Sequence, residues 1–238
     1  MRLVLTRPKQ DSERSAVPLR ARGHDVLIAP LMRIETIAAD LDRHCGAIVV
    51  TSANAIAAVA AHEARNGLIR LPVYAVGERT ANAARAVGFA DVTSADGDLR
   101  DLVRLISKLP SVSEKTRLLY LAGENRAGDL VGDLAAHGIA VEMALVYRAV
   151  TVAFPPDLIA ALKAESVDGV LHFSRRSADN YLDGAKKAGI VAQSLAGKHF
   201  CLSAATAAPL VEAGAVGVVV AGQPDEAALL ALVEAGRA

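Results

Sequence analysis

The sequence repeats itself at long range, and the order of the repeated segments restricts the folds that the chain can adopt. Residues 3–35 and 118–150 follow one pattern: a short apolar run, a polar turn, a helical stretch that ends at Gly23 or Gly138, and a second apolar run that leads into an extended segment. Three further pairs of segments match in the same order, namely 49–52 with 171–174, 74–81 with 200–207, and 91–102 with 217–228. We therefore expect two domains of similar fold.

The order of the expected strands indicates how the two domains divide the chain. Residues 37–146 contain five expected strands in succession, which is enough for one small open sheet. The two ends of the chain contain two and three strands, so a five-stranded partner needs both of them. We predict a continuous domain, 37–146, inserted into a discontinuous domain, 1–30 and 152–238, with linkers at about 31–36 and 145–151. A tandem split near residue 117 is the less favoured alternative.

Strands and helices alternate along the whole chain. Apolar runs such as 47–50 and 118–121 have the length and composition of buried strands, and stretches of helical length separate them. This alternation predicts the α/β class, with parallel sheets covered by helices on both faces. Four helices are expected to start at Ala55, Ala81, Ser177 and Ala208, and side-chain caps are expected from Asp11 or Ser12, Asp98 and Asp225. Residues 110–117 form the most loop-like run.

Two extended stretches, 29–35 and 144–150, carry long polar residues among apolar ones. Tyr147 and Arg148 stand in the middle of the second stretch, where a strand buried on both faces would have apolar residues. We interpret the two stretches as antiparallel linker strands between the domains. A tyrosine on such a linker would face the cleft between the domains, which makes Tyr147 a candidate functional residue.

Composition excludes several classes of protein. Hydrophobic residues make up 53% of the 238 residues, enough for a sizeable core, and the formal net charge is zero, so no global field attracts nucleic acid or an anionic surface. Two cysteines, Cys45 and Cys201, make neither a disulfide framework nor a Cys-based zinc site. The sequence has no signal-peptide pattern and no stretch of about 18 apolar residues. We expect a cytoplasmic monomer that binds neither nucleic acid nor a membrane.

Six polar turns directly follow expected strands. In an open parallel sheet, ligands bind beyond the carboxyl ends of the strands, which is where these turns lie. Nearly all of them carry a small hydroxyl residue or glycine before a helix, a pattern that fits ordinary N-capping and also anion binding by backbone N–H groups and helix N-termini. A ligand with several carboxylates or phosphates suits such a set. The turns are Thr6–Arg7, Thr51–Asn54, Gly77–Thr80, Gly123–Arg126, Ser174–Arg176 and Ser203–Thr206.

Other patterns that would carry chemistry are incomplete. Gly77-x-x-Thr80 lacks the three-glycine spacing of a dinucleotide fingerprint, and no Walker lysine is present. The six histidines show no metal-ligand spacing. His172 is close in sequence to Ser174, but no acidic residue is evident to orient it, which argues against a catalytic triad.

A further set of segments spans nearly the whole chain in a fixed order: Leu5–Pro8, Val50–Asn54, Ala75–Ala81, Gly123–Arg126, Val146–Arg148 and Val219–Asp225. Taken together, they resemble the uroporphyrinogen-III synthase family. The resemblance implies two flavodoxin-like domains on a two-stranded antiparallel linker, with the ligand site in the cleft between them. It also implies a step of porphyrin and heme biosynthesis, in which the linear tetrapyrrole hydroxymethylbilane becomes uroporphyrinogen III. The resemblance further implies that neither a cofactor nor a metal takes part.

The resemblance also implies roles for individual residues. A linker tyrosine is the family's usual candidate acid, here Tyr147, and Ser52 and Thr80 match cleft positions. With the turns included, the expected substrate-binding residues are Arg7, Thr51, Ser52, Asn54, Gly77, Thr80, Gly123, Asn125, Arg126, Ser174, Arg175, Ser203 and Thr206. Two positions depart from the family pattern. Ser203 replaces a usual glycine, and Arg175 replaces a frequent proline, so arginine side chains are expected to help bind carboxylates there.

The chemistry that the resemblance implies is that of a cyclising hydro-lyase. We expect Tyr147 to hydrogen-bond the departing hydroxyl group, while the electron-rich pyrrole donates electron density and stabilises the cation that forms. The cleft then holds the linear tetrapyrrole in a curled conformation, so that attack at the substituted carbon of its last ring gives a spiro intermediate. The rival hypothesis is a cytoplasmic two-domain binding protein that closes on a polycarboxylate or another anionic small molecule without chemistry. A glycosyl- or phosphate-transferring enzyme is a third possibility, and it lacks an evident nucleotide site.

Overall fold

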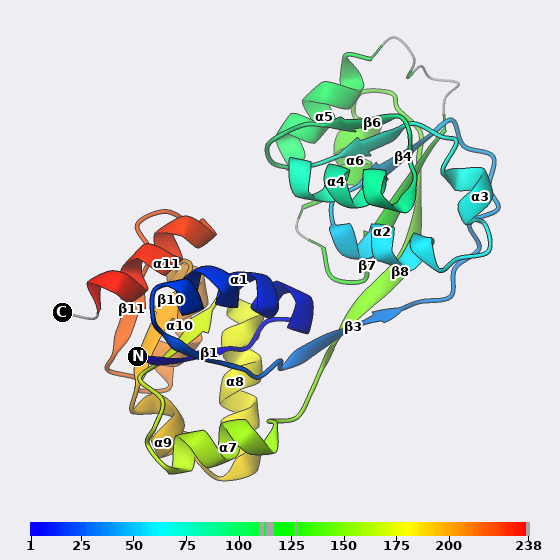
Figure 1. The fold of residues 1–238 in the computed structure, drawn as a ribbon. Coiled ribbons are helices and arrows are strands. Elements are labelled where there is room, and N and C mark those ends of the chain that lie inside the picture. Colours follow the sequence, from blue (N-terminus) through cyan, green and yellow to red (C-terminus); the bar gives the residue numbers. More distant parts are fainter. Residues whose placement is uncertain (110–111, 113–116, 127, 237–238) are drawn as a thin grey trace. The chain divides into compact units, whose positions relative to one another are not determined.

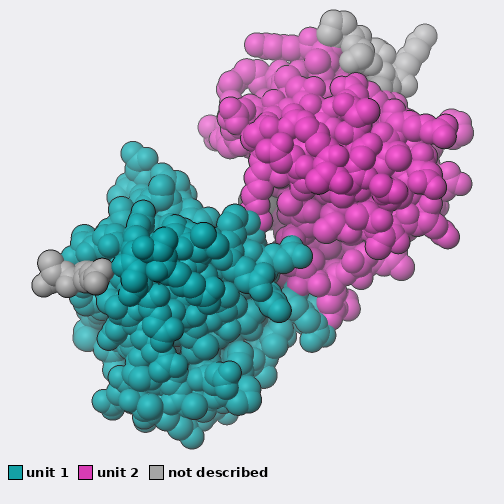
Figure 2. All heavy atoms as spheres, viewed as in Figure 1, with its two compact units in different colours: residues 1–33, 150–238 teal, residues 34–149 magenta. Residues whose placement is uncertain are grey.

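The computed structural model describes residues 1–109, 112, 117–126 and 128–236, and it divides into two compact units (Figures 1 and 2). Unit 1 comprises Met1–Arg33 and Val150–Ala238, and unit 2 comprises Ile34–Ala149. Unit 1 is therefore built from both ends of the chain, and unit 2 is continuous in sequence. Each unit contains its own sheet with helices on both faces, and five neighbouring strands of each sheet run parallel.

The sheet of unit 1 has the strand order β11-β10-β9-β1-β2. Its neighbouring strands pair in parallel throughout. The strands are β1 (Arg2–Leu5), β2 (Asp25–Ile28), β9 (Gly169–His172), β10 (Lys198–Cys201) and β11 (Val218–Val220). The helices are α1 (Lys9–Ala21), α7 (Pro156–Lys163), α8 (Arg175–Ala188), α9 (Val191–Leu195), α10 (Ala204–Glu212) and α11 (Glu226–Ala235).

Two hydrophobic clusters cover the two faces of this sheet, because successive strand residues point to opposite sides. Leu3 and Leu5 of β1 pack with apolar residues of α1 and α11. Val4, which lies between them, packs with residues of α7, α8 and α10 on the other face. All three of these β1 side chains are completely buried.

The sheet of unit 2 has the strand order β3-β8-β7-β4-β5-β6. Its strands are β3 (Met32–Thr36), β4 (Ala47–Val50), β5 (Val73–Ala75), β6 (Val92–Ser94), β7 (Leu118–Gly123) and β8 (Val141–Thr151). Its helices are α2 (Ala53–Ala60), α3 (Arg65–Leu68), α4 (Glu78–Val87), α5 (Leu99–Ser107) and α6 (Leu130–Ala135). Ile48 and Val50 of β4 pack with α2 and α4, while Ala47 and Val49 pack with α5 and α6.

The two units share one topology. Strands β11-β10-β9-β1-β2 of unit 1 correspond in order to β6-β5-β4-β7-β8 of unit 2, which is the correspondence that the sequence repeat predicts. The glycines expected to end the first helix of each repeat also match, since Gly23 and Gly138 both have positive φ angles, of 82° and 74°. The predicted α/β class with two parallel-sheet domains is confirmed.

Strand β3 lies beside β8 in the sheet of unit 2, and the chain passes between the units along both strands. The N–H of Ile37 donates to the carbonyl of Val146 at 2.9 Å, and the N–H of Val152 donates to the carbonyl of Leu31 at 2.9 Å. Residue numbers rise along one strand as they fall along the other, so the pair is antiparallel. Among the described residues, no helix has the length and apolar character needed to cross a membrane.

The expected cap at the start of α1 is wrong. The helix begins at Lys9 after Pro8, whose fixed φ leads the chain into the first turn. Ser12 instead donates its hydroxyl to the carbonyl of Arg7 at 2.8 Å, and Asp11 pairs with Arg14 at 3.0 Å. By contrast, the expected caps at Asp98 and Asp225 are confirmed: their carboxylates accept backbone N–H groups of α5 and α11.

Four helices begin earlier than expected, at Ala53, Glu78, Arg175 and Ala204. Their first turns contain residues that the sequence pattern places in the preceding turn, because polar residues are common both in turns and at helix starts. The short helices α3 and α9 are further elements that the sequence pattern does not predict. The run 110–117, expected to be a loop, lies outside the described residues except for 112 and 117.

Candidate functional site

In each unit, three of the six polar turns lie side by side at the carboxyl edge of the sheet. In unit 2 they follow the neighbouring strands β7, β4 and β5, and in unit 1 they follow β10, β9 and β1. Because the strands within each set run parallel, the turns of one set meet at the same edge. The structure therefore brings the predicted site residues together as two groups, one in each unit.

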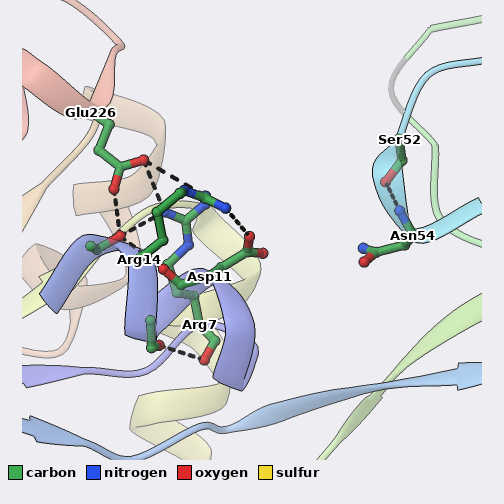
Figure 3. Close-up of polar contacts among 8 residues, drawn as sticks. Arg7, Asp11, Arg14, Ser52, Asn54 and Glu226 are labelled. Atoms are coloured by element: carbon green, nitrogen blue, oxygen red, sulfur yellow. Dashed lines mark hydrogen bonds and ion pairs between the residues drawn. The ribbon is translucent and has the colours of Figure 1, made fainter. Parts of the chain in front are cut away.

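Serines cap three of the helices that follow these turns. Ser52 accepts the N–H of Asn54 at 3.2 Å, as Figure 3 shows. Ser174 accepts the N–H of Ser177 at 3.2 Å, and Ser203 accepts the N–H of Thr206 at 3.3 Å. The N-capping interpretation is confirmed at all three positions. Any anion bound at these helix starts would be held by the other backbone N–H groups of the first turn.

The start of α4 differs from the other three. Gly77 occupies the N-cap position in an extended conformation (φ −154°, ψ 166°), where it forms no side-chain cap. A Cβ added at Gly77 would meet nothing within 4 Å, so neither packing nor backbone strain within the described residues requires glycine there. Thr80 is buried in the first turn of α4 at 5% exposure. At this helix start no side chain at the N-cap position covers the backbone, which is what close approach of a ligand requires.

Tyr147 lies on β8, half-buried, directly opposite Gly123 at the end of β7. The register between the two strands shifts there: Ala122 faces Leu145, but Gly123 faces Tyr147, so Val146 is an extra residue in β8. Such a bulge re-aims the side chain that follows it. The ring of Tyr147 consequently lies against Gly123, at the edge where the turns of unit 2 meet.

Tyr120 adds a second phenol to unit 2. It lies in β7 with 3% exposure, and its hydroxyl is 3.0 Å from the hydroxyl of Thr51, which follows β4. Burial raises the pKa of Tyr120, and the hydrogen bond to Thr51 and the charge of Arg126 act in the opposite direction. Tyr120 also lines a cavity of about 320 Å³ together with Arg126.

The guanidinium group of Arg126 forms hydrogen bonds with the backbone at the end of β7. Its Nη1 donates to the carbonyl of Gly123 at 3.1 Å and to that of Glu124 at 3.3 Å. The side chain is otherwise exposed, so its positive charge is available to an anion at the carboxyl edge of the sheet. Asn125, beside it in the same turn, is exposed as well.

The sequence model of one protein family, described as uroporphyrinogen-III synthase HemD, matches residues 13–231 of the chain. The chain belongs to the uroporphyrinogen-III synthase HemD family. The resemblance inferred from the sequence segments is thereby confirmed. Comparison with curated protein sequences gave no match.

Solved structures of family members share the fold. Uroporphyrinogen-III synthetase from Helicobacter pylori is similar over 100% of both chains, with a TM-score of 0.70 and 22% sequence identity. A mutant uroporphyrinogen III synthase from Thermus thermophilus is similar over 100% of this chain and 99% of that one, with a TM-score of 0.53 and 18% identity. These likenesses support the fold of this HemD-family chain.

Arg7 is held by residues of its own unit. Its guanidinium group pairs with Glu226 at 3.2 Å (Figure 3). The same group donates to Ser15 at 3.2 Å and lies 4.1 Å from the ring centroid of Phe173. Burial lowers the pKa of Arg7, against the attraction of the carboxylates of Asp11 and Glu226. These contacts connect α1 to α11, which the local sequence could not reveal because Glu226 is 219 positions away.

The two departures from the family pattern are both at helix starts of unit 1. Arg175 is exposed in the first turn of α8 and lies 3.9 Å from Asp179, one turn further along the helix. Ser203 caps α10, and its hydroxyl is also 3.1 Å from that of Thr206, which is buried. Ser203 thus has a structural role, whereas Arg175 retains a solvent-facing charge.

His172 takes part in a buried pair rather than in a triad. Its Nε2 lies 3.1 Å from Nδ1 of His199, neither ring is exposed, and Tyr181 packs edge-on against both. Burial lowers the pKa of both imidazoles, to about 4 for His199. Among the residues that the structure describes, no cluster of three or more His, Cys, Asp or Glu side chains is placed to hold a metal ion.

Sequence reasoning missed Tyr120. The available signal was a tyrosine within the otherwise aliphatic run Leu118–Leu121, immediately before the glycine turn. A buried tyrosine usually finds a hydrogen-bond partner, but the sequence does not show that the partner is Thr51 on the neighbouring strand.

Proposed function

We propose that this member of the HemD family is a uroporphyrinogen-III synthase. In the proposed reaction, hydroxymethylbilane loses water and closes into uroporphyrinogen III with inversion of the last pyrrole ring. Membership of the family over residues 13–231 is the first support. The observation that carries the proposal is the placement of Tyr147 by the strand bulge at the edge of unit 2 where three polar turns meet.

The proposed substrate is a linear tetrapyrrole with many carboxylates. Helix N-termini and backbone N–H groups favour negative charge, and the carboxyl edge of each sheet contains several helix starts. In unit 2, the bare start of α4 at Gly77 and the exposed guanidinium group of Arg126 suit carboxylates. Because the net charge of the chain is zero, such local groups would have to attract the substrate.

Tyr147 supplies the acid in the proposed mechanism. Its phenol hydrogen-bonds the hydroxyl group that leaves the substrate, the carbon–oxygen bond breaks, and water departs with the donated proton. The electron-rich pyrrole stabilises the resulting cation. The bound tetrapyrrole is held in a curled conformation, so that the substituted carbon of its last ring attacks this cation and a spiro intermediate forms. Catalysis is therefore mainly a matter of positioning the substrate.

The test is incubation of the purified protein with hydroxymethylbilane, followed by oxidation of the products and chromatographic separation of the isomers. We expect faster formation of the type III isomer than in buffer alone. Heat-denatured protein serves as the control, because the substrate also cyclises spontaneously to the type I isomer without ring inversion. Binding of the tetrapyrrole without acceleration of type III formation would overturn the proposed activity in favour of a binding protein.

A further inference from the structure

Gly123 lies in close contact with Tyr147, and this contact distinguishes between two alternative roles for the glycine. The sequence suggested that Gly123 belongs to an anion-binding turn, where glycine would allow a ligand to approach the backbone. In the structure, the space that a side chain would need at Gly123 is filled by the phenol of Tyr147. An ideal Cβ there would lie 2.5 Å from Cζ, 2.7 Å from Oη and 2.8 Å from Cε2 of Tyr147.

Backbone conformation does not explain the glycine. Gly123 is absent from the glycines with positive φ, and it ends a strand whose earlier residues, Leu118–Leu121, pair regularly with β8. The three atoms nearest to the added Cβ all belong to the outer end of the Tyr147 ring. Alanine would therefore fit the backbone, and the phenol is the group that would have to move.

The surrounding contacts hold both residues in place. The N–H of Glu124 donates to the carbonyl of Tyr147 at 2.9 Å, which locks the two strand ends together beyond the bulge. Arg126 donates to the carbonyl of Gly123 at 3.1 Å. With the backbones fixed on both sides, the absent side chain of Gly123 determines where the phenol of Tyr147 lies.

We infer that Gly123 is a positioning residue whose missing side chain sets the phenol of Tyr147 in its catalytic place, rather than a residue that contacts the substrate. The inference rests on the proposed function of Tyr147. The bulge in β8 and Gly123 act together, because the bulge turns the ring towards β7 and the glycine leaves room for it.

The experiment combines Gly123→Ala with two versions of residue 147. In the wild-type background, Gly123→Ala should lower kcat for type III formation by about 100-fold, as expected for loss of one positioned acid, with little change in KM. In the Tyr147→Ala background the ring is gone, so Gly123→Ala should change activity by no more than about twofold. If Gly123 touches the substrate, the alanine would raise KM in both backgrounds, and that result would overturn the inference.

A spectroscopic readout separates positioning from loss of the fold. With ¹³C-labelled tyrosine, the Cζ resonance of Tyr147 is assigned by its disappearance in Tyr147→Phe. Gly123→Ala should shift that resonance while leaving those of Tyr74 and Tyr181 in place. Gly67→Ala is the matched control, because an added Cβ at Gly67 meets nothing within 4 Å. An unchanged Tyr147 resonance in folded Gly123→Ala protein would refute the positioning role.

The two proposals fail in distinguishable ways. If Tyr147 is not the acid, Tyr147→Phe retains wild-type turnover, yet Gly123→Ala still shifts the Tyr147 resonance. If Gly123 does not position the ring, Tyr147→Phe remains slow while Gly123→Ala leaves the resonance where it was.

Discussion

At the residue scale, Tyr147 is the side chain on which the proposed chemistry depends. We expect Tyr147→Phe to slow type III formation by about 100-fold, because one positioned acid is lost while the pyrrole still drives departure of the hydroxyl group. The fraction of the type I isomer should rise, since spontaneous cyclisation competes with the slower enzyme. The melting temperature should hardly change, because the phenylalanine ring still packs on Gly123. Turnover and isomer ratio are measured by chromatography, and full activity of the folded variant would remove Tyr147 from the mechanism.

The buried pair His172–His199 makes a separate prediction about stability and pH. Both imidazoles are neutral in the folded protein because burial lowers their pKa values, to about 4 for His199. In the unfolded chain the pKa of histidine is about 6.5, so the unfolded state binds protons that the folded state does not. The free energy of unfolding should therefore fall as the pH is lowered from about 6.5 towards about 4, by up to about 1.4 kcal/mol per pH unit for each imidazole.

Urea unfolding at pH values across this range measures the effect. His172→Leu, which removes a fully buried imidazole whose Nδ1 has no hydrogen-bond partner among the described residues, should flatten the dependence. His137→Gln is the control, because His137 is exposed. An equally steep dependence in His172→Leu and in wild type would contradict the assignment to this pair.

At the element scale, the start of α4 is the helix terminus best suited to a ligand. Gly77→Val should leave the fold intact, because its extended backbone accepts a β-branched residue and the added Cβ meets nothing within 4 Å. Bulk at this position would nevertheless keep a carboxylate from the first-turn N–H groups. We expect tetrapyrrole binding at least about tenfold weaker, the scale of one charge-assisted hydrogen bond.

Isothermal titration calorimetry with the tetrapyrrole product measures this loss, with circular dichroism as the check on folding. Gly67→Val on α3 introduces the same change at another open position of unit 2 and should leave binding unaltered. If folded Gly77→Val protein binds the product as tightly as wild type, the Gly77 turn does not belong to the site.

At the scale of the whole molecule, each unit contains its own hydrophobic clusters on both sides of its own sheet. Unit 2 is also continuous in sequence, from Ile34 to Ala149. A fragment of residues 34–149 should therefore fold by itself, with a cooperative urea transition followed by circular dichroism. The fragment 1–33 is the contrasting case and should stay unfolded, because its two strands need β9 to complete a core. A non-cooperative transition for 34–149 would show that unit 2 depends on unit 1.

The sequence by itself determined the fold class, the correspondence between the strands of the two units, and several of the helix caps. The strand correspondence follows from a repeat that is visible at long range. The caps at Asp98 and Asp225 follow from local periodicity, since each cap lies next to the helix that it begins. Helix starts were placed a few residues late because polar residues of a first turn look like those of the turn before it. The cap at Asp11 or Ser12 failed because Pro8 already begins the helix.

Only the tertiary structure decided which contacts the candidate site residues make. Arg7, a predicted substrate-binding residue, pairs with Glu226 from the far end of the chain, and Tyr120 acquires Thr51 from a neighbouring strand. Gly123 and Tyr147 meet because of one extra residue in β8, a shift in register that leaves no mark in the local sequence pattern. Such contacts join residues that are distant along the chain, and their geometry depends on strand register and packing rather than on the residue types themselves.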